Sequence, residues 1–502
     1  MIMKIYNRKK EKRETMDKLK KIISWHVILT IQVVATIVLL FFIFRLNVVP
    51  TVYFVLLTLV LILLCFIDFT LMKPKRKHHD GHHHHRHKTK PREIVGKVIS
   101  LVLSIVMIIG AVLVSKGHST LDDITNANTK STHYAIIVLK DSKINSLSDI
   151  KNESIEYCLQ YDEEKDMNKV IAQAKEKESS INFDIVRTYT NLGDDLYNNT
   201  VHAILINTAY NGMFEENHPE FENETKEIWT SDIETKVKDF STRVSVTNTP
   251  FIVYISGIDT YGGISTVSRS DVNMIVTVNP NTKKILLTSI PRDYYVTLAN
   301  MNQKDKLTHS GLAGPENTVK TMSNFLGTNI NYYARVNFTS LVTMVDALGG
   351  ITVDVDRDFS AGGYTYKTGP QQMNGVQALA FSRERHSFED GDNVRVKHQQ
   401  DVLMGMLNKM MSPAIITNYT SVLKAISGCF ETNMESNDIT DLIKMQLNDN
   451  AAWTFEQKQF AGNGIMQKGG AYMPDSMLYY MIPDEASVKE NLQAINDVLN
   501  GK

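Results

Sequence analysis

The sequence contains very little cysteine. Only three of its 502 residues are cysteines, and Cys65 lies within a long apolar run. Cys158 and Cys429 are therefore the only pair available outside that run, and two cysteines are too few for a framework of disulfides. We do not expect such a framework, although a single bridge between these two residues remains an open alternative.

Net charge is also almost absent, at −1, but the charges are unevenly distributed. Residues 1–116 contain 20 Lys and Arg against 6 Asp and Glu, a net charge of +14. The remaining residues contain 34 against 49, a net charge of −15. A polar domain with this acidic excess has no reason to bind nucleic acid non-specifically. The basic N-terminal part also lacks a helix-turn-helix pattern, so we predict no nucleic-acid partner.

A cleavable signal peptide is missing as well, because no small-residue cleavage site follows a short apolar core. The sequence contains instead three long apolar runs, each long enough to cross a hydrocarbon core of about 30 Å as a helix. These runs are Ile22–Phe44, Val49–Met72 and Ile94–Val114. We therefore predict that residues 1–116 form a membrane anchor with three transmembrane helices (22–44, 49–72 and 94–114).

The basic residues of the loops predict how the anchor is oriented. The first 21 residues contain nine Lys and Arg, the loop Lys73–Glu93 contains eight, and Arg45–Val48 contains one. Basic loops stay in the cytoplasm, so the N-terminus is predicted to be cytoplasmic and residues 115–502 extracytoplasmic, in a multi-pass protein of the cell membrane.

The second loop also contains seven histidines between His78 and His87. They could bind a metal, but we favour a basic loop that contacts anionic lipid.

The first part of the outer segment has the pattern of a small α/β domain. Residues 117–130 resemble a linker, and residues 131–240 alternate short apolar strands with an amphipathic helix. The expected strands are Tyr134–Leu139, Phe183–Arg187 and Ala203–Ile206, and the expected helix is Glu163–Lys175. No group of reactive residues occurs in this domain, so we interpret it as an accessory module for packing or partner binding.

The second part has longer buried strands followed by amphipathic helices. Nearly continuous apolar runs predict strands that are buried on both faces, at Pro250–Ser256, Asp271–Val278 and Lys284–Ile290. Helices are expected at Asn317–Leu326, Ser340–Leu348, Gly375–Arg385 and Asn393–Met410. We predict an α/β/α sandwich with a mixed central sheet over residues 248–410. Residues 411–502 are expected to complete it with helices at 417–426, 440–447 and 488–499, the last capped by Ser487, and a short strand near 455–460.

Charged residues gather where the predicted strands end. Asp259 follows the first strand, Arg269 and Asp271 begin the second, and Arg292 and Asp293 follow the third. Open α/β sheets bind ligands at such strand ends. The guanidinium group suits phosphate oxygens, and carboxylates suit Mg²⁺. Further along, Arg383 and Arg385 end one predicted helix, while Asp392, Arg395 and Gln399 begin the next.

Several of these segments resemble the LytR–CpsA–Psr family. The resemblance covers about residues 248–410. The three-span anchor and the domain at 131–240 are similar to the capsule-regulator branch of that family, in which an accessory domain precedes the catalytic one. The segments that carry it are RSDVNMIVTVNP (269–280), LLTSIPRDYYV (286–296), DKLTHS (305–310), VNFTSLVTMVDALGGITVDVD (336–356) and NGVQALAFSRERHSFEDGDNVRVKHQQDVL (374–403).

The resemblance implies a role for each matched residue. Asp259 and Asp271 match the ligands of Mg²⁺, for which Mn²⁺ is an alternative. The residues that match the pyrophosphate-binding group are Arg269, Arg292, Arg383, Arg385, Arg395, Gln399 and Lys306, and among them Arg292, Arg383 and Arg385 are expected to be catalytic. Asp293 and Asp392 are candidates by position for a general base, and equally for residues that orient an arginine.

The resemblance also implies a phosphotransferase. Family members attach a glycan carried on polyprenyl pyrophosphate to peptidoglycan through a phosphodiester, and polyprenyl phosphate is released. For this chain the glycan is expected to be capsular polysaccharide, with capsule-assembly proteins as further partners. Two other functions stay open: a membrane regulator or attenuator of capsule synthesis that acts through protein contacts, and a carrier that binds lipid-linked glycan without chemistry.

Overall fold

The computed structural model describes residues 24–73, 91–125, 129–150, 153–215, 217–258, 264–388, 391–412 and 430–502. These residues form two compact units. The first contains the described residues up to 121 together with 439–450, and the second contains those of 122–438 and 451–502. Asp259, Cys429, the histidines between His78 and His87, and the predicted helix at 417–426 all lie outside the described residues. The side chain of Asp392 is not described either.

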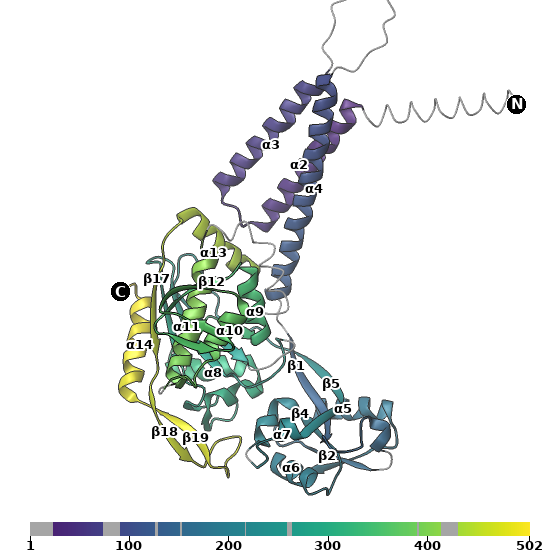
Figure 1. The fold of residues 1–502 in the computed structure, drawn as a ribbon, viewed down its shortest axis with the longest axis vertical. Helices are drawn as coiled ribbons and strands as arrows, with labels where there is room; N and C mark the ends of the chain where they lie inside the picture. Colours follow the sequence, from purple (N-terminus) through teal and green to yellow (C-terminus); the bar gives the residue numbers. More distant parts are fainter. Residues whose placement is uncertain are drawn as a thin grey trace, which may run out of the picture. The chain divides into compact units, whose positions relative to one another are not determined.

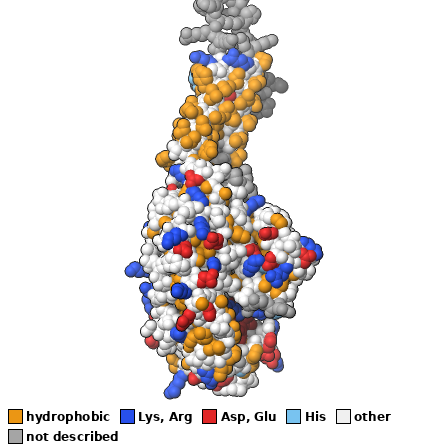
Figure 2. All heavy atoms as spheres, turned by 90° about the vertical axis from the view of Figure 1, so that its left-hand side faces the viewer, with side chains coloured by type: hydrophobic (Ala, Val, Ile, Leu, Met, Phe, Trp, Pro, Cys, Tyr) orange, Lys and Arg blue, Asp and Glu red, His pale blue; other side chains and the backbone are white. Residues whose placement is uncertain are grey.

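Three helices of the first unit are long and apolar enough to cross a membrane. They are α2 (Trp25–Leu46), α3 (Thr51–Met72) and residues 91–116 of α4 (Pro91–Thr125). Hydrophobic side chains cover most of their visible surface (Figure 2), as expected for helices surrounded by lipid. The last of them continues to Thr125, so most of the segment that resembled a linker is helical.

A buried polar contact joins these three helices to one another. The side-chain amide of Gln32 on α2 donates a hydrogen bond of 2.8 Å to Asp68 on α3. The hydroxyl of Ser100 on α4 donates one of 2.6 Å to the amide oxygen of Gln32. All three side chains are at most 1% exposed. Polar groups buried between apolar helices need hydrogen-bond partners, and here each helix supplies one such group.

The accessory domain contains a five-stranded sheet in the order β3-β2-β4-β1-β5. Strand β2 is parallel to β3 and β4, whereas β1 is antiparallel to β4 and β5. Its elements are β1 (Thr129–Leu139), β2 (Ser154–Cys158), α5 (Glu164–Lys177), β3 (Asn182–Val186), α6 (Tyr189–Tyr197), β4 (Ile204–Asn207), the 3₁₀-helix η2 (Thr208–Met213), α7 (Phe221–Glu224) and β5 (Thr225–Lys236). Cys158 is a buried free thiol in this domain.

The larger domain is built on a six-stranded mixed sheet in the order β16-β11-β6-β7-β8-β17. Figure 1 shows the helices of this domain gathered around its strands. Strands β11 and β17 are parallel to their neighbours β6 and β8, and the other pairs are antiparallel. The strands are β6 (Phe251–Ile258), β7 (Val272–Asn279), β8 (Lys284–Ile290), β11 (Tyr332–Asn337), β16 (Phe430–Thr432) and β17 (Thr454–Gln459).

Helices cover both faces of this sheet. On one face, Leu286 and Ile290 of β8 belong to the same core as Val319 of α8 and Ile495 of α14. Side chains alternate along a strand, so Ser289 points to the opposite face, where Gln400 of α11 donates a hydrogen bond of 2.9 Å to its hydroxyl. The helices are α8 (Pro315–Leu326), α9 (Phe338–Ala347), α10 (Gly375–Arg383), α11 (Gly391–Met410) and α14 (Glu485–Leu499). Helix α13 (Ser436–Asp449) belongs, from Ile439 onward, to the first unit.

Short hairpins and a 3₁₀-helix complete the domain. They are β9 (Tyr295–Thr297) with β10 (Lys304–Lys306), η3 (Leu307–Ala313), β12 (Ile351–Val355) with β15 (Gly369–Met373), β13 (Phe359–Ala361) with β14 (Tyr364–Tyr366), and β18 (Gly462–Gln467) with β19 (Leu478–Pro483). The predicted fold class is confirmed: three apolar helices, a small α/β domain, and helices on both faces of a mixed sheet. The predicted cap of α14 was wrong, because Asp484 is the N-cap and Ser487 lies in the first turn.

Candidate functional site

The candidate site lies at one edge of the six-stranded sheet. Strands β6, β8, β11 and β17 all run in one direction, and β7 runs in the other. The carboxyl ends of the four strands and the start of β7 therefore meet at the same edge. Asp271 precedes β7, and Arg292 follows β8 after a proline, so the topology brings together residues that are 21 positions apart in the sequence.

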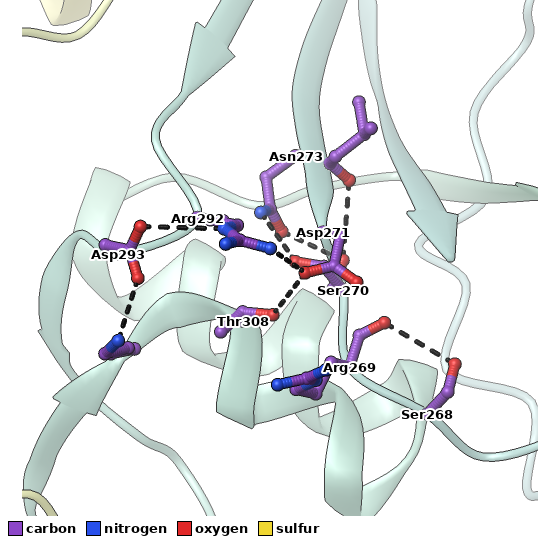
Figure 3. Close-up of polar contacts among 10 residues, drawn as sticks. Ser268, Arg269, Ser270, Asp271, Asn273, Arg292, Asp293 and Thr308 are labelled. Carbon is purple, nitrogen blue, oxygen red and sulfur yellow. Dashed lines mark hydrogen bonds and ion pairs between the residues drawn. The ribbon is translucent and has the colours of Figure 1, made fainter. Parts of the chain in front are cut away.

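Charged side chains at this edge form a chain of ion pairs (Figure 3). The Nη1 atom of Arg292 donates a hydrogen bond of 2.9 Å to Oδ1 of Asp271, and its Nε atom lies 3.6 Å from Oδ2 of Asp293. The other oxygen of Asp293 lies 3.1 Å from Nζ of Lys306. The Arg292 side chain is 40% exposed, while the other three are 15–21% exposed. The guanidinium of Arg292 is thus partly exposed, whereas the two carboxylates and the lysine of this chain of ion pairs are mostly buried.

Backbone hydrogen bonds fix the three segments that carry these side chains. The N–H of Ser270 donates to the carbonyl of Thr308 at 3.0 Å, and the N–H of Thr308 donates to the carbonyl of Arg292 at 2.9 Å. The Thr308 hydroxyl also donates a hydrogen bond of 3.3 Å to Oδ1 of Asp271. Because the segments are joined through their backbones, the positions of the charged groups do not depend on the ion pairs alone.

A layer of buried hydroxyl and amide groups lies beneath Asp271. Ser270 contacts the hydroxyl of Ser256 at 2.7 Å and donates to the Asn273 side chain at 2.9 Å, and Tyr254 contacts both Ser270 and Asn273. Burial raises the pKa of the Tyr254 phenol well above its usual value, so this group stays neutral. These contacts hold the loop before β7 without adding charge to the site.

Arg269 is half-buried beside this network and approaches the accessory domain. A methyl group added at Gly212 of η2 would lie 2.5 Å from its Nη1 atom. A methyl group at Gly311 would lie 2.5 Å from the carbonyl oxygen of Ser268, closer than carbon and oxygen can approach. Two glycines therefore contact this loop, Gly212 at the guanidinium and Gly311 at the backbone.

The other predicted arginines form a second group where α10 ends and α11 begins. Arg383 and Arg385 are exposed, and Arg395 and Gln399 are partly buried on α11. Residues 395 and 399 are four apart, so they share one face of the helix. Asn393 accepts a hydrogen bond of 2.7 Å from Gln459, which pairs with Ser289 of β8. The start of α11 is thus at the same sheet edge as Arg292.

The described residues supply only part of a metal site. No group of three or more His, Cys, Asp or Glu in the described chain could hold a metal ion. Oδ1 of Asp271 accepts two hydrogen bonds, and its Oδ2 atom accepts none within the part of the chain described. One carboxylate oxygen can therefore face an ion, which fits Mg²⁺, since Mg²⁺ in proteins uses one or two carboxylates together with substrate phosphates.

Sequence reasoning missed two residues at this site. Thr308 was not singled out, although it lies within the DKLTHS segment that contains Lys306. Gly212 gave no signal at all, because it belongs to the accessory domain and contacts Arg269 across 57 positions of sequence.

Comparisons with known proteins match the part of the chain that contains this site. A family model described as the LytR_cpsA_psr family matches residues 217–495. A protein of Enterococcus faecalis named polyisoprenyl-teichoic acid–peptidoglycan teichoic acid transferase TagU is 34% identical over 243 residues, which are 48% of this chain and 79% of the relative. The Bacillus subtilis protein of the same name is 32% identical over 251 residues, 50% of this chain and 78% of the relative.

Solved structures are similar to the same part of the chain. The crystal structure of B. subtilis TagU is 30% identical, with a TM-score of 0.41 over 50% of this chain and 97% of that one. A structure described as TagT bound to LI-WTA is 24% identical, with a TM-score of 0.42 over 52% of this chain and 97% of that one.

Proposed function

This chain belongs to the LytR–CpsA–Psr family, and we propose that it is a phosphotransferase which attaches a polyprenyl-pyrophosphate-linked glycan to peptidoglycan. Relatives at 32–34% identity are named as transferases of teichoic acid to peptidoglycan. The observation that carries the proposal is the placement of Arg292 against Asp271 at the ligand-binding edge of the sheet.

The charges at this edge suit a diphosphate diester. The Arg292 guanidinium faces Asp271 through Nη1 and Asp293 through Nε, and its side chain is 40% exposed. Arg383, Arg385 and Arg395, with Gln399, would form a second side of the site. The start of α11 supports this, because it lies at the same sheet edge as Arg292. A pyrophosphate group carries at least two negative charges, and arginines satisfy its oxygens with paired donors while remaining charged.

Asp271 would hold Mg²⁺ or Mn²⁺ together with Asp259, and the bound ion would neutralise charge on the phosphate oxygens. Of the two roles predicted for Asp293, general base or orienting residue, this proposal keeps one. Both of its oxygens face cations, Arg292 on one side and Lys306 on the other, so we assign it the orienting role and not that of the base. Asp392 remains the other candidate for the base.

The reaction we propose breaks a phosphoanhydride bond of the donor and forms a phosphate ester bond to the acceptor. A hydroxyl of the peptidoglycan sugar attacks the glycan-proximal phosphorus, and the bond between that phosphorus and the bridging oxygen breaks. Polyprenyl monophosphate leaves with the bridging oxygen, and the hydroxyl proton passes to the solvent or to a base. No covalent enzyme intermediate is needed, since phosphoryl transfer depends mainly on positioning and charge neutralisation.

The membrane anchor would bring the site to its lipid-borne donor. Three apolar helices precede the catalytic domain, and the basic loops place that domain outside the cytoplasm in our proposal. We propose capsular polysaccharide as the glycan, because the accessory domain and three-span anchor resemble the capsule-regulator branch. Capsule-assembly proteins would then be neighbours of the anchor.

The test uses the full chain in lipid nanodiscs with a synthetic polyprenyl-pyrophosphate oligosaccharide and peptidoglycan fragments. We expect equal amounts of glycan-linked peptidoglycan and polyprenyl phosphate, formed with Mg²⁺ and not with a chelator. A donor that binds without giving either product would replace the transferase with a carrier. Offering capsule-type and teichoic-acid-type donors together tests the glycan, and preference for the teichoic-acid type would contradict the capsular assignment.

A further inference from the structure

The accessory domain contacts the catalytic domain at the segments that carry the proposed donor-binding residues. We propose that it is a positioning element of the donor site, which holds Arg269 and the Lys306 segment in the arrangement that binds the pyrophosphate. This inference rests on the proposed function, because the donor-binding roles of those two residues do. It assigns to the accessory domain a part in donor affinity.

The first contact is between Gly212 and the guanidinium of Arg269. A methyl group at position 212 would lie 2.5 Å from Nη1 and 2.9 Å from Cζ of the arginine, so the guanidinium rests directly against the backbone of η2. Within the described chain no carboxylate forms an ion pair with Arg269. The backbone of the accessory domain therefore limits where this cation can lie.

The 3₁₀-helix that carries Gly212 is itself firmly held. The Asn207 side chain accepts a hydrogen bond of 3.1 Å from the N–H of Ala209, and it donates one of 2.9 Å to Asp162. Asp162 also accepts a hydrogen bond of 2.5 Å from Tyr189. These hydrogen bonds hold η2 in place, so its backbone can keep the Arg269 guanidinium in one position.

The second contact is a short stretch of strand pairing with the Arg269 loop. The N–H of Ser131 donates to the carbonyl of Ser265 at 3.0 Å, and the N–H of Val267 donates to the carbonyl of Ser131 at 2.8 Å. Close by, Lys130 donates to the carbonyl of Ala313 at 3.1 Å and pairs with Glu316 at 2.9 Å. The loop is thus fixed to the accessory domain two residues before Arg269.

The third contact leads to Lys306. The Tyr161 hydroxyl donates a hydrogen bond to the carbonyl of Tyr472, and the two rings meet edge to face with centroids 4.8 Å apart. The N–H of Tyr472 donates to Oδ2 of Asp305 at 2.9 Å, and Oδ1 of Asp305 accepts from the N–H of Lys306 at 2.7 Å. Lys306 in turn pairs with Asp293, the neighbour of Arg292.

Asp305 stays charged in this arrangement. Burial alone would raise its pKa, but the charge of His309 and the two backbone N–H donors outweigh burial and hold the pKa below its usual range. The carboxylate is fully buried and links the Tyr472 loop to the Lys306 strand. Contacts made by the accessory domain therefore reach both cations that flank the Arg292–Asp271 pair.

The test adds a side chain at Gly212 of the full-length protein in nanodiscs. The backbone of Gly212 is not in the left-handed region, so Gly212→Val acts through space on Arg269 and does not strain the turn. We expect it to weaken binding of a fluorescent short-chain polyprenyl pyrophosphate by roughly tenfold or more, the scale of losing a charged hydrogen bond. The KM for donor should rise by a similar factor, with little change in kcat.

A double-mutant cycle separates positioning from a general structural defect. In a chain that already contains Arg269→Ala, Gly212→Val should have no further effect on binding, because the group it displaces is gone. Asn217→Ala, at an exposed site after the same 3₁₀-helix, should bind the probe like the wild type. Gly212→Ala and Tyr161→Phe provide gentler tests if the valine variant does not fold, and each should weaken binding in the same direction.

The inference and the proposed function fail in different ways. Equal probe binding by wild type, Gly212→Val, Gly212→Ala and Tyr161→Phe would overturn the positioning role, even if the wild type turns over donor. A full effect of Gly212→Val in the Arg269→Ala chain would overturn it as well. A wild type that binds the probe but never releases polyprenyl phosphate would refute the transferase, while the binding cycle would still decide the role of the accessory domain.

Discussion

Arg292 and Asp271 share a hydrogen bond of 2.9 Å between Nη1 and Oδ1, and that same oxygen also accepts the Thr308 hydroxyl at 3.3 Å. The carboxylate therefore has one oxygen committed to holding the arginine and one that can face a metal ion. Asp271 therefore links the proposed cation site to the proposed metal site, and the predictions for Asp271 and Arg292 depend on this link.

Replacing Asp271 with Asn should reduce turnover by about 10²–10³, the usual scale for losing one charged group that stabilises a transition state. The amide keeps the size of the side chain but removes the charge that orients Arg292 and would bind the ion. The measurement is the initial rate of polyprenyl phosphate release. Asp356→Asn is the matched control, since Asp356 pairs with Lys397 and Arg357 away from this network. Equal rates for the two variants would contradict the assignment.

Arg292→Lys should lower kcat/KM by at least about tenfold, although the positive charge is kept. Lysine has no planar fork of donors and cannot contact Asp271 and a phosphate oxygen with the same geometry. Arg243→Lys serves as the control, because Arg243 is an exposed arginine paired with Asp239 and Glu435. A lysine variant with wild-type kinetics would mean that only net charge matters at position 292.

Asp68→Leu should destabilise the helical anchor by roughly 1 kcal/mol, the scale of a polar contact between membrane helices. The change leaves the buried Gln32 amide without the acceptor that lies 2.8 Å away. Asp68→Asn keeps an oxygen acceptor and should stay near the wild type. Unfolding of the full chain in detergent, followed by helix content, measures the difference, and equal stability of the leucine variant would show that the contact is dispensable.

His398 should make the catalytic domain less stable below neutral pH. Burial lowers the pKa of its imidazole to about 4, from an ordinary value of 6.5, so the folded state disfavours the proton that the unfolded chain accepts. The contribution of His398 to the free energy of unfolding is thus constant above about pH 6.5. Between about pH 6.5 and pH 4 the free energy of unfolding falls by up to about 1.4 kcal/mol per pH unit. Melting of the wild type and of His398→Phe across this range tests the slope, which should be shallower in the variant.

Much of the site edge could be predicted because buried strands leave a clear apolar pattern in the sequence. The apolar runs before Asp259 and Arg292 and after Asp271 indicated buried strands, and ligand sites occur at the ends of such strands. The structure places Asp271 and Arg292 in contact, while Asp259 lies outside the described residues. The roles of these side chains stay predictions, since geometry alone does not measure them.

Other features could not be predicted from local pattern. Strand β5 has no long apolar run, so its hydrophobic pattern is too weak to predict a strand. Ser487 looked like a helix cap, yet Asp484 three residues earlier offers a carboxylate to its N–H at 2.8 Å. The packing of Gly212 on Arg269 depends on tertiary structure and leaves no trace in either segment.

The most direct test of the central claim follows the fate of the two phosphorus atoms. A donor labelled with ³²P only at the glycan-proximal phosphate is incubated with the full chain, Mg²⁺ and peptidoglycan fragments. Attack at that phosphorus, within the Arg292–Asp271 site, places the label in the peptidoglycan product and leaves unlabelled polyprenyl phosphate. Label that remains on the lipid as polyprenyl pyrophosphate would mean that the glycosidic bond is the one broken, and the account of this site would be wrong.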